Sequence, residues 1–385
     1  MSAIAMIERL IAFDTTSHLS NLALIDDVRA YLEGFGVESR LTYNDEKTKA
    51  NLYATIGPEG AGGVVLSGHT DVVPVAGQNW TSDPFKVRRA NGRLYGRGTS
   101  DMKSFIAVAL HLLPELVKRT LKTPIHFAFS YDEEVGCHGA RPLIRDILDN
   151  LPKPKVVIVG EPTMMKLINQ HKGAAAFRVS IHGLEGHSSG PERGVNANFV
   201  AVRLISEILR IQDELIAGAD PKNGFQPPYP TFNVGTIKGG TSGNIIPNHC
   251  EFALELRVLP GQTTDPIVDR IKAFAAGRLV PEMKKVTAQA DIHFHKLGEI
   301  PPLSPWPDSP AEALIRLITG LNEAGAVPYG TEAGLFQEGG MPTVIFGPGD
   351  IAQAHQADEF IDVSQVEACE AFMRKLFDWA EKTPA

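Results

Sequence analysis

Three acidic residues stand together directly after an apolar segment that alternates as a β-strand does. Residues 125–131 read IHFAFSY, and Asp132, Glu133 and Glu134 follow them. Adjacent carboxylates at the end of a buried strand repel one another and lose hydration, and both effects oppose their ionised forms. The pattern therefore predicts nearby positive charge, which a bound metal ion would supply.

Other apolar segments end in the same way. VVLSG is followed by His69 and Asp71, VVIVG by Glu161, and TVIFGPG, across a loop, by His355. In open α/β sheets, ligands bind outside the carboxyl ends of the strands. We therefore expect the side chains from these strand ends to meet at one edge of a sheet. Asp101 follows the glycine-rich LYGRGTS and opens a helical pattern.

Two imidazoles and several carboxylates are a ligand set for divalent transition metals, of which zinc fits best. The set exceeds four ligands, which favours two ions that share a bridging carboxylate, about 3.5–4 Å apart, and activate water for hydrolysis. Asp71, two residues after His69, could accept the second imidazole N–H and fix the tautomer. Of the adjacent Glu133 and Glu134, one can bind metal while the other acts as a general base.

Each of these residues also has an ordinary structural interpretation. Asp101 could be only an acid at the start of a helix, favoured by the helix dipole. Glu161, which precedes a proline, could end a strand, and His355 could be an exposed loop histidine. The acids at 132–134 could form a solvated turn. From the residues alone these alternatives stay open.

The elements that must position these side chains follow from the hydrophobic pattern. Helical and strand patterns alternate through the first part of the chain, which predicts an α/β domain with much parallel pairing. The expected helices lie at 22–36, 100–117 and 140–150, and the expected strands at 51–57, 62–69, 124–131 and 154–160.

The pattern changes after about residue 172, where strand patterns surround two helical ones. We interpret this block as a separate α+β domain, the proline-rich segment 298–310 as the return linker, and the rest as a continuation of the α/β domain. The predicted fold is a mixed, largely parallel sheet with flanking helices, formed by residues 1–175 and 298–385. Residues 176–297 form the inserted domain.

Composition excludes several classes of protein. The net charge of −8 is spread along the 385 residues without a basic cluster, so a nucleic-acid partner is not expected. Cys137, Cys250 and Cys369 are far apart and odd in number, which fits a reducing cytoplasm rather than a disulfide framework. No apolar run has the length of a membrane span, and the N-terminus resembles an amphipathic helix rather than a signal peptide.

Eight motifs, in order over nearly the whole chain, resemble the M20 metallopeptidase family, and its acetylornithine deacetylase branch most closely. They are SGHTDVVPV, LYGRGTSDMK, YDEEVG, VGEPT, HKGAAAFRV, GHSSGPERGVNA, GTEAGLFQ and AHQADEF. The resemblance implies a zinc-peptidase-like catalytic domain in which His69 and Glu161 hold one metal ion. Glu134 and His355 hold the other, and Asp101 bridges them.

The resemblance also assigns Glu133 as the general base, Asp71 as a supporting carboxylate, and the inserted domain as a lid that forms a homodimer. His187 resembles the lid histidine that reaches a neighbouring subunit's active site and polarises the scissile carbonyl. Asn244 and Arg257 resemble lid residues that bind the substrate carboxylate.

The implied reaction is amide hydrolysis by a water that two divalent ions activate, zinc or alternatively cobalt. Glu133 takes the water proton and delivers it to the leaving nitrogen, while His187 helps to hold the oxyanion. The implied substrate is N2-acetyl-L-ornithine, which yields L-ornithine and acetate in arginine biosynthesis.

Three alternatives remain. Related hydrolases of the family act on other small substrates, as N-acyl-amino-acid amidohydrolases, succinyl-diaminopimelate desuccinylases or dipeptidases. GHSSG matches the G-x-S-x-G nucleophile elbow of serine hydrolases with Ser188 at its centre, but the elbow requires a helix straight after the serine, and GPERG follows here. A non-enzymatic dimeric binding module is disfavoured, because all five predicted ligands and Glu133 are present.

Overall fold

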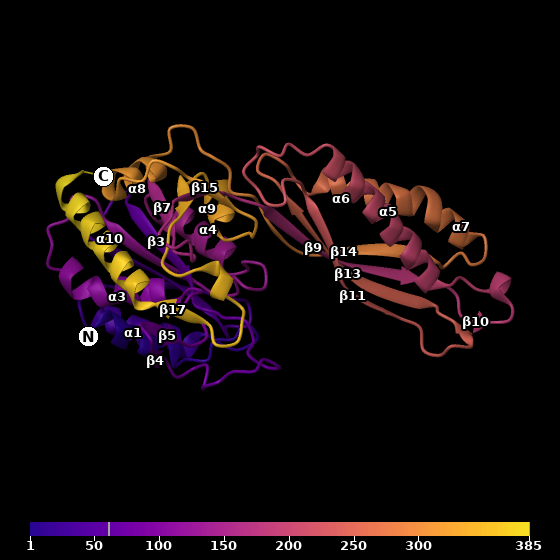
Figure 1. Cartoon of the computed structure of the whole chain (residues 1–385), viewed down its shortest axis with the longest axis horizontal. Coiled ribbons are helices and arrows are strands. Elements are labelled where there is room, and N and C mark those ends of the chain that lie inside the picture. The colour runs from indigo at the N-terminus through magenta and orange to yellow at the C-terminus, as the bar shows by residue number, and fades with distance from the viewer. Residues whose placement is uncertain (61, 385) are drawn as a thin grey trace. The chain divides into compact units, whose positions relative to one another are not determined.

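The computed structural model describes residues 1–60 and 62–384, and the chain forms two compact units (Figure 1). Unit 1 consists of Met1–Gln170, Leu303–Gly325 and the chain from Thr331 onward, so both ends of the chain belong to it. Unit 2 consists of His171–Pro302 and Ala326–Gly330. The catalytic role predicted for 1–175 and 298–385, and the lid and dimerisation roles predicted for 176–297, stay predictions.

A mixed sheet forms the centre of unit 1, with the strand order β1-β2-β6-β3-β7-β16-β8-β15. Its middle strands β6, β3, β7 and β16 run parallel to one another. Outside them β1 pairs antiparallel with β2, β2 with β6, and β8 with β16. The fold class predicted from the sequence is therefore confirmed. The strands are β1 Ser39–Tyr43, β2 Ala50–Ile56, β3 Val64–His69, β6 Ile125–Ser130, β7 Val156–Val159, β8 Ile168–His171, β15 Gly325–Val327 and β16 Thr343–Ile345.

Helices bury both faces of this sheet, which explains why β3, β6 and β7 are buried throughout and mostly apolar, without alternating exposed residues. One face packs with five helices into a hydrophobic core that includes Leu66, Phe127 and Ile158. Those helices are α1 Ala3–Ile11, α2 Leu22–Glu33, α3 Lys103–Leu116, α8 Pro310–Thr319 and α10 Val363–Lys382. Outside that core, α4 Ala140–Asn150 and α9 Ala333–Glu338 pack against the strands.

Unit 2 is built on an antiparallel sheet with the order β11-β13-β9-β14. Along β13 buried and half-exposed residues alternate, and the buried face packs against α5 and α6. The strands are β9 Gly173–His182, β11 Thr231–Gly239, β13 His249–Val258 and β14 Asp291–Ile300, and the helices are α5 Ala197–Ala217, α6 Asp265–Phe274 and α7 Val280–Lys284. The predicted α+β character of this block is present.

One element boundary differs from the prediction. Gly298–Ile300, predicted as the start of the linker, continue β14, because they pair with β9 after a register shift at Lys296 and Gly298. A bulge at Leu297 thus lets β14 continue its pairing with β9 as far as Ile300.

Short elements complete the structure. They are β4 Arg88–Ala90, β5 Arg93–Tyr95 and β17 Phe360–Asp362 in a small sheet, β10 Gly186–His187 paired with β12 Ile245–Ile246, the 3₁₀ turns Pro191–Arg193 and Ile351–Gln353, and the π-helical turn Ala275–Leu279.

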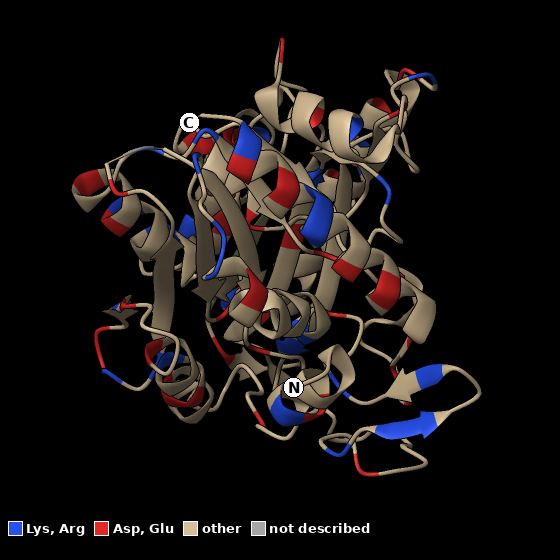
Figure 2. Ribbon diagram, turned by 90° about the vertical axis from the view of Figure 1, so that its left-hand side faces the viewer, with Lys and Arg blue, Asp and Glu red and all other residues tan. Residues whose placement is uncertain are grey.

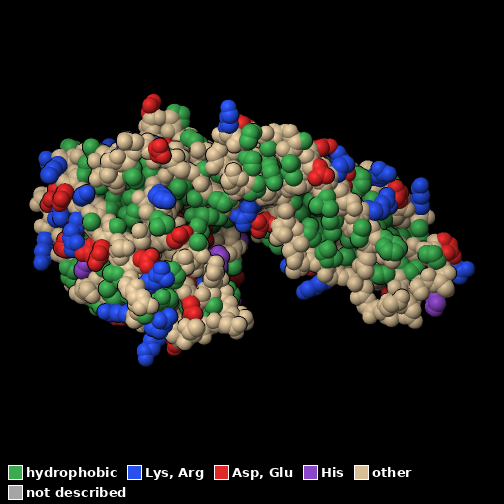
Figure 3. Space-filling model, viewed as in Figure 1, with side chains coloured by type: hydrophobic (Ala, Val, Ile, Leu, Met, Phe, Trp, Pro, Cys, Tyr) green, Lys and Arg blue, Asp and Glu red, His purple; other side chains and the backbone are tan. Residues whose placement is uncertain are grey.

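The surfaces carry mixed charge. Lys and Arg are interspersed with Asp and Glu over the helices seen in Figure 2, and hydrophobic side chains also appear on the visible face of unit 2 (Figure 3). The three cysteines are free and buried, as the sequence predicts. Within residues 1–60 and 62–384, no helix is long and apolar enough to cross a membrane.

Candidate metal centre

The predicted ligands of unit 1 stand where the parallel strands of its sheet end. His69 is the last residue of β3, Glu161 lies two residues beyond β7, and Glu134 lies in the turn after β6. His355 lies in the loop that follows β16, and Asp101 lies two residues before the start of α3. Because β6, β3, β7 and β16 are neighbours that run in one direction, their carboxyl ends share one edge.

The two oxygens of Asp101 face two different histidines. Oδ1 lies 3.0 Å from His69 Nε2, and Oδ2 lies 3.3 Å from His355 Nε2. Each histidine has a further carboxylate close by: Glu161 Oε1 is 3.8 Å from His69 Nε2, and Glu134 Oε2 is 2.9 Å from His355 Nε2. The side chains therefore form two ligand groups that Asp101 joins.

The donor set fits two divalent ions. His69, Asp101 and Glu134 bring ligand atoms within 4.8 Å of one another, and so do His69, Glu133 and Glu161. Glu161 Oε1 is buried and has no hydrogen-bond partner among the described residues, as expected for an oxygen reserved for a cation. Imidazole nitrogens with carboxylate oxygens suit zinc and its neighbours in the first transition row.

Buried negative charge dominates the electrostatics of this cluster. Burial, reinforced by neighbouring carboxylates, raises the pKa of Glu133 and Glu161 well above the usual value, and raises the pKa of Glu134 to about 7. Burial alone would lower the pKa of His69, but Asp101 and the other acids outweigh it and raise that pKa well above its usual value. A pair of divalent cations would offset this repulsion.

Asp71 supports the site differently from the sequence interpretation. The Nδ1–H of His69 donates to the backbone carbonyl of Asp71 at 2.9 Å, whereas the Asp71 carboxylate is 3.6 Å away. That carboxylate instead accepts hydrogen bonds from the Ser17 hydroxyl at 2.7 Å and from the backbone N–H groups of Glu133 at 3.0 Å and Glu134 at 3.3 Å. The carboxylate thus holds the turn that carries Glu133 and Glu134, and its predicted role in fixing the tautomer of His69 stays a prediction.

The third acid of the opening triplet does not join the cluster. Asp132 forms an ion pair with Lys49, whose ammonium also donates to the carbonyl of Ser17. Lys49 belongs to a segment with no recognisable motif, so its ion pair with Asp132 could not be predicted from the sequence. One protein cation thus neutralises Asp132, while Glu133 and Glu134 face the metal centre.

Glu332 is a buried acid whose role the sequence did not reveal. Its Oε1 accepts from the Ser67 hydroxyl at 2.6 Å and its Oε2 from the Ser130 hydroxyl at 2.7 Å. Ser67 in β3 and Ser130 in β6 are polar residues within otherwise apolar strands, and that interruption was the available signal. Glu332 therefore links β3 and β6 near their carboxyl ends, where His69 and the acidic turn follow.

The predicted site residues of unit 2 lie at two different places in that unit. His187 and Asn244 are neighbours, because β10 pairs with β12 and the Ser188 N–H donates to the Asn244 carbonyl at 3.1 Å. Arg257 lies on β13 and forms an ion pair with Glu255 at 2.7 Å, away from that loop. The structure brings His187 and Asn244 together, and their roles and that of Arg257 stay predictions.

Ser188 lacks the surroundings of a nucleophile elbow. The elbow needs a helix directly after the serine, but here a turn and the three-residue 3₁₀ segment Pro191–Arg193 follow. The interpretation of GHSSG as an accidental match is consistent with this geometry.

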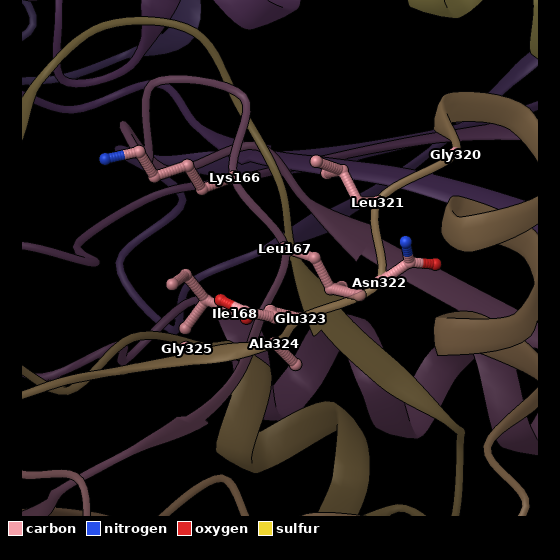
Figure 4. Close-up of a pocket in the computed structure, with 9 residues that line it drawn as sticks. All are labelled: Lys166, Leu167, Ile168, Gly320, Leu321, Asn322, Glu323, Ala324 and Gly325. Carbon is pink, nitrogen blue, oxygen red and sulfur yellow. The ribbon is translucent and has the colours of Figure 1, made fainter.

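Unit 1 also contains a cavity of about 510 Å³ that is separate from these residues (Figure 4). The residues around it are Lys166, Leu167, Ile168, Gly320, Leu321, Asn322, Glu323, Ala324 and Gly325. None of the predicted site residues lines it, so cavity volume alone does not locate the chemistry of this chain.

Comparison with known proteins agrees with the motifs. Residues 65–378 match the family described as Peptidase family M20/M25/M40. The chain is 36% identical over 376 residues to an acetylornithine deacetylase of Myxococcus xanthus, covering 96% of this chain and 95% of that protein. It is 36% identical over 369 residues to an acetylornithine deacetylase of Proteus mirabilis, covering 95% and 92%.

Among solved structures, the fold is similar to that of an M20 family metallo-carboxypeptidase from Sulfolobus solfataricus. The TM-score is 0.76 at 19% sequence identity, and the match covers 100% of both chains. At this identity the similarity concerns the fold, and it supports the same mixed α/β architecture.

Proposed function

The chain belongs to peptidase family M20/M25/M40, whose members are dinuclear metallohydrolases, and on that premise we propose that it removes the acetyl group from N2-acetyl-L-ornithine. The products are L-ornithine and acetate, and the reaction serves arginine biosynthesis. The choice of substrate is supported by the 36% identity, over 96% of this chain, to an acetylornithine deacetylase. The resemblance of the motifs to the same branch supports it as well.

The hydrolytic part of the proposal is carried by one observation: the two oxygens of Asp101 face His69 at 3.0 Å and His355 at 3.3 Å. In the proposed centre His69 and Glu161 would hold one divalent ion, Glu134 and His355 would hold a second, and Asp101 would serve both. Zinc is the proposed ion and cobalt the alternative, because both accept nitrogen and oxygen ligands. Such ions, when bound, supply Lewis acidity toward water and toward the acyl oxygen.

Glu133 is the proposed general base. Its carboxylate is buried beside His69 and Glu161, and the Asp71 carboxylate holds its backbone N–H. Burial raises the pKa of its carboxyl group, which favours proton uptake from water. As the water oxygen bonds to the acyl carbon, Glu133 takes the water proton and then delivers it to the nitrogen as the carbon–nitrogen bond breaks.

His187 is proposed to polarise the acyl oxygen, with Asn244 and Arg257 binding the substrate carboxylate. The backbone N–H of Ser189 donates to His187 Nδ1 at 3.2 Å, so Nδ1 is an acceptor and the proton resides on Nε2. An imidazole in that tautomer can donate a hydrogen bond to a developing oxyanion. Arg257 would have to exchange its pairing with Glu255 for the substrate.

A cytoplasmic homodimer formed through unit 2 is proposed as well. Helix α5 exposes four large apolar side chains, Phe199 at 71%, Val202 at 61%, Leu209 at 59% and Ile216 at 43%. Four such side chains on one helix form an apolar patch that a second copy of the chain would bury. The three free, buried cysteines fit a reducing compartment.

The substrate is tested by a comparison of kcat/KM values. The panel contains N2-acetyl-L-ornithine, other N-acetyl amino acids, N-succinyl-diaminopimelate and dipeptides, all measured with zinc and then with cobalt. We expect the highest kcat/KM for N2-acetyl-L-ornithine. A higher value for any other compound would replace the substrate with that compound and assign the chain to a different activity within the same family.

A further inference from the structure

A buried ion pair lies beside the metal centre without belonging to it. Arg97 and Glu359 are each 1% exposed, and Arg97 Nη1 donates to Glu359 Oε2 at 2.7 Å. Removing two charges from water is unfavourable, and apolar residues of similar volume often stabilise a fold equally well. Since burial of this ion pair does not by itself stabilise the fold, we look for its role in the hydrogen bonds that Arg97 and Glu359 form with neighbouring segments.

Glu359 holds the backbone of Asp101. Its Oε1 accepts hydrogen bonds from the backbone N–H groups of Ser100 at 2.8 Å and Asp101 at 3.1 Å. Because both carboxylate oxygens of Asp101 have separate partners, a small rotation of its backbone would lengthen one contact as it shortens the other. Glu359 thus fixes the orientation on which a bridging carboxylate depends.

Arg97 holds the loop of His355 through a second path. Its Nη2 donates to Gln78 Oε1 at 2.6 Å, and Gln78 Nε2 donates to the backbone carbonyl of His355 at 2.7 Å. Arg97 Nη1 also approaches the carbonyl of Gln356 at 3.3 Å. Trp80 Nε1 donates to the same Gln78 oxygen at 3.0 Å, which restrains the amide further.

His355 needs such support because of its backbone. Its φ is +64°, in the left-handed region that non-glycine residues rarely adopt. Its side chain is 53% exposed, so packing alone does not hold it. His69, at the end of β3, and Glu161, two residues beyond β7, are buried in contrast, and His69 meets this network through Asp101.

We infer that Gln78, held by Arg97, is a positioning residue that sets the affinity of the metal position formed by Glu134 and His355 and leaves the position formed by His69 and Glu161 nearly unaffected. Glu359 in turn positions Asp101, which both metal positions share. This inference rests on the ligand assignment of the proposed function. It depends neither on the substrate nor on Glu133. The asymmetry follows from the fold, because one histidine comes from a strand end and the other from a loop that the network holds.

The test is a metal titration of the metal-free protein by calorimetry and equilibrium dialysis, first with Zn²⁺ and then with Co²⁺, whose visible absorption reports coordination geometry. Gln78→Met is the main variant, because Gln78 is half-exposed and methionine keeps its length while it removes all three hydrogen bonds of the side-chain amide. Gln353→Met is the control, since it removes an amide from the same loop outside the network.

In Gln78→Met we expect one of two binding events to weaken about tenfold or more, the usual effect of losing a residue that orients a ligand. The other event should stay within about twofold, and kcat should recover at saturating metal. Gln78→Glu, which keeps the bond from Arg97 but loses the donor to His355, should behave like Gln78→Met. The double variant Arg97→Met/Glu359→Met removes the acceptor of the Ser100 and Asp101 backbone N–H groups, so its melting temperature should fall and both binding events should weaken.

Unchanged titration of Gln78→Met, or equal weakening of both events, would overturn the inference. A wild-type protein that binds only one ion would overturn it together with the proposed ligand assignment. A different preferred substrate would affect neither titration, so failure of the proposed activity and failure of this inference are distinguishable.

Discussion

Replacement of Asp71 by asparagine should lower kcat even when the metal positions are saturated. The carboxylate of Asp71 holds the acidic turn through the backbone N–H groups of Glu133 at 3.0 Å and Glu134 at 3.3 Å, and it also accepts from Ser17 at 2.7 Å. Asparagine offers one acceptor oxygen, and its NH₂ group would face a second donor. At least one hydrogen bond to a charged acceptor is therefore lost.

The size of the effect follows from the energy of that bond. A hydrogen bond to a charged group contributes about 1.5–3 kcal/mol. If the loss displaces Glu133 from the attacking water, kcat falls about tenfold to a hundredfold, because each 1.36 kcal/mol corresponds to about one factor of ten. Ser17→Ala is the matched control: it removes another donor from the same carboxylate but leaves both hydrogen bonds to the acidic turn, so kcat should fall less than in Asp71→Asn.

The assay is steady-state turnover of Asp71→Asn over a range of added zinc, together with a metal titration. Because the imidazole N–H of His69 donates to the backbone carbonyl of residue 71, the substitution leaves that bond in place. Full recovery of kcat in excess zinc, with only the metal affinity reduced, would refute this reasoning. It would show that the carboxylate acts through His69 after all.

Further outcomes can be checked on the same protein. Glu133→Gln should lower kcat by about a hundredfold or more while metal content stays at the wild-type level, and wild-type turnover in this variant would remove Glu133 as the base. A strong chelator should abolish activity and added zinc or cobalt restore it, whereas turnover that persists in chelator and falls with a serine-directed phosphonylating reagent would point to Ser188. Burial lowers the pKa of His126 to about 4, so this histidine is protonated at a higher pH in the unfolded chain than in the folded one. Its contribution to the free energy of unfolding should therefore decline as the pH falls from about 6.5 to 4 and stay constant above about pH 6.5. Between pH 7.5 and 5, wild type should lose about 2 kcal/mol more unfolding free energy than His126→Asn, and parallel pH profiles in denaturant would contradict this. Val202→Asp should convert the proposed dimer to monomer in sedimentation at micromolar concentration, and a persistent dimer would exclude the α5 face as the interface.

The sequence by itself determined the framework of unit 1 and the candidate ligands. Hydrophobic patterns are local, so β3, β6 and β7 and the helices between them could be predicted residue by residue. Once parallel pairing is expected, the carboxyl ends of the strands must meet, and His69 and Glu161 follow from that rule. Asp101 and His355 lie on loops, so the pattern named them only as candidates with ordinary alternatives, and the resemblance to a family assigned their roles.

The tertiary structure decided which charges are paired and which remain for the metal centre. Lys49 forms an ion pair with Asp132, which therefore does not join the cluster. Glu332 accepts hydrogen bonds from Ser67 and Ser130, and Glu359 accepts one from the backbone N–H of Asp101. These contacts join residues up to 265 positions apart in the chain. No local pattern encodes them, because a hydrogen bond or an ion pair depends on the final approach of a few atoms, whereas the periodicity of apolar residues specifies only which face of each element is buried.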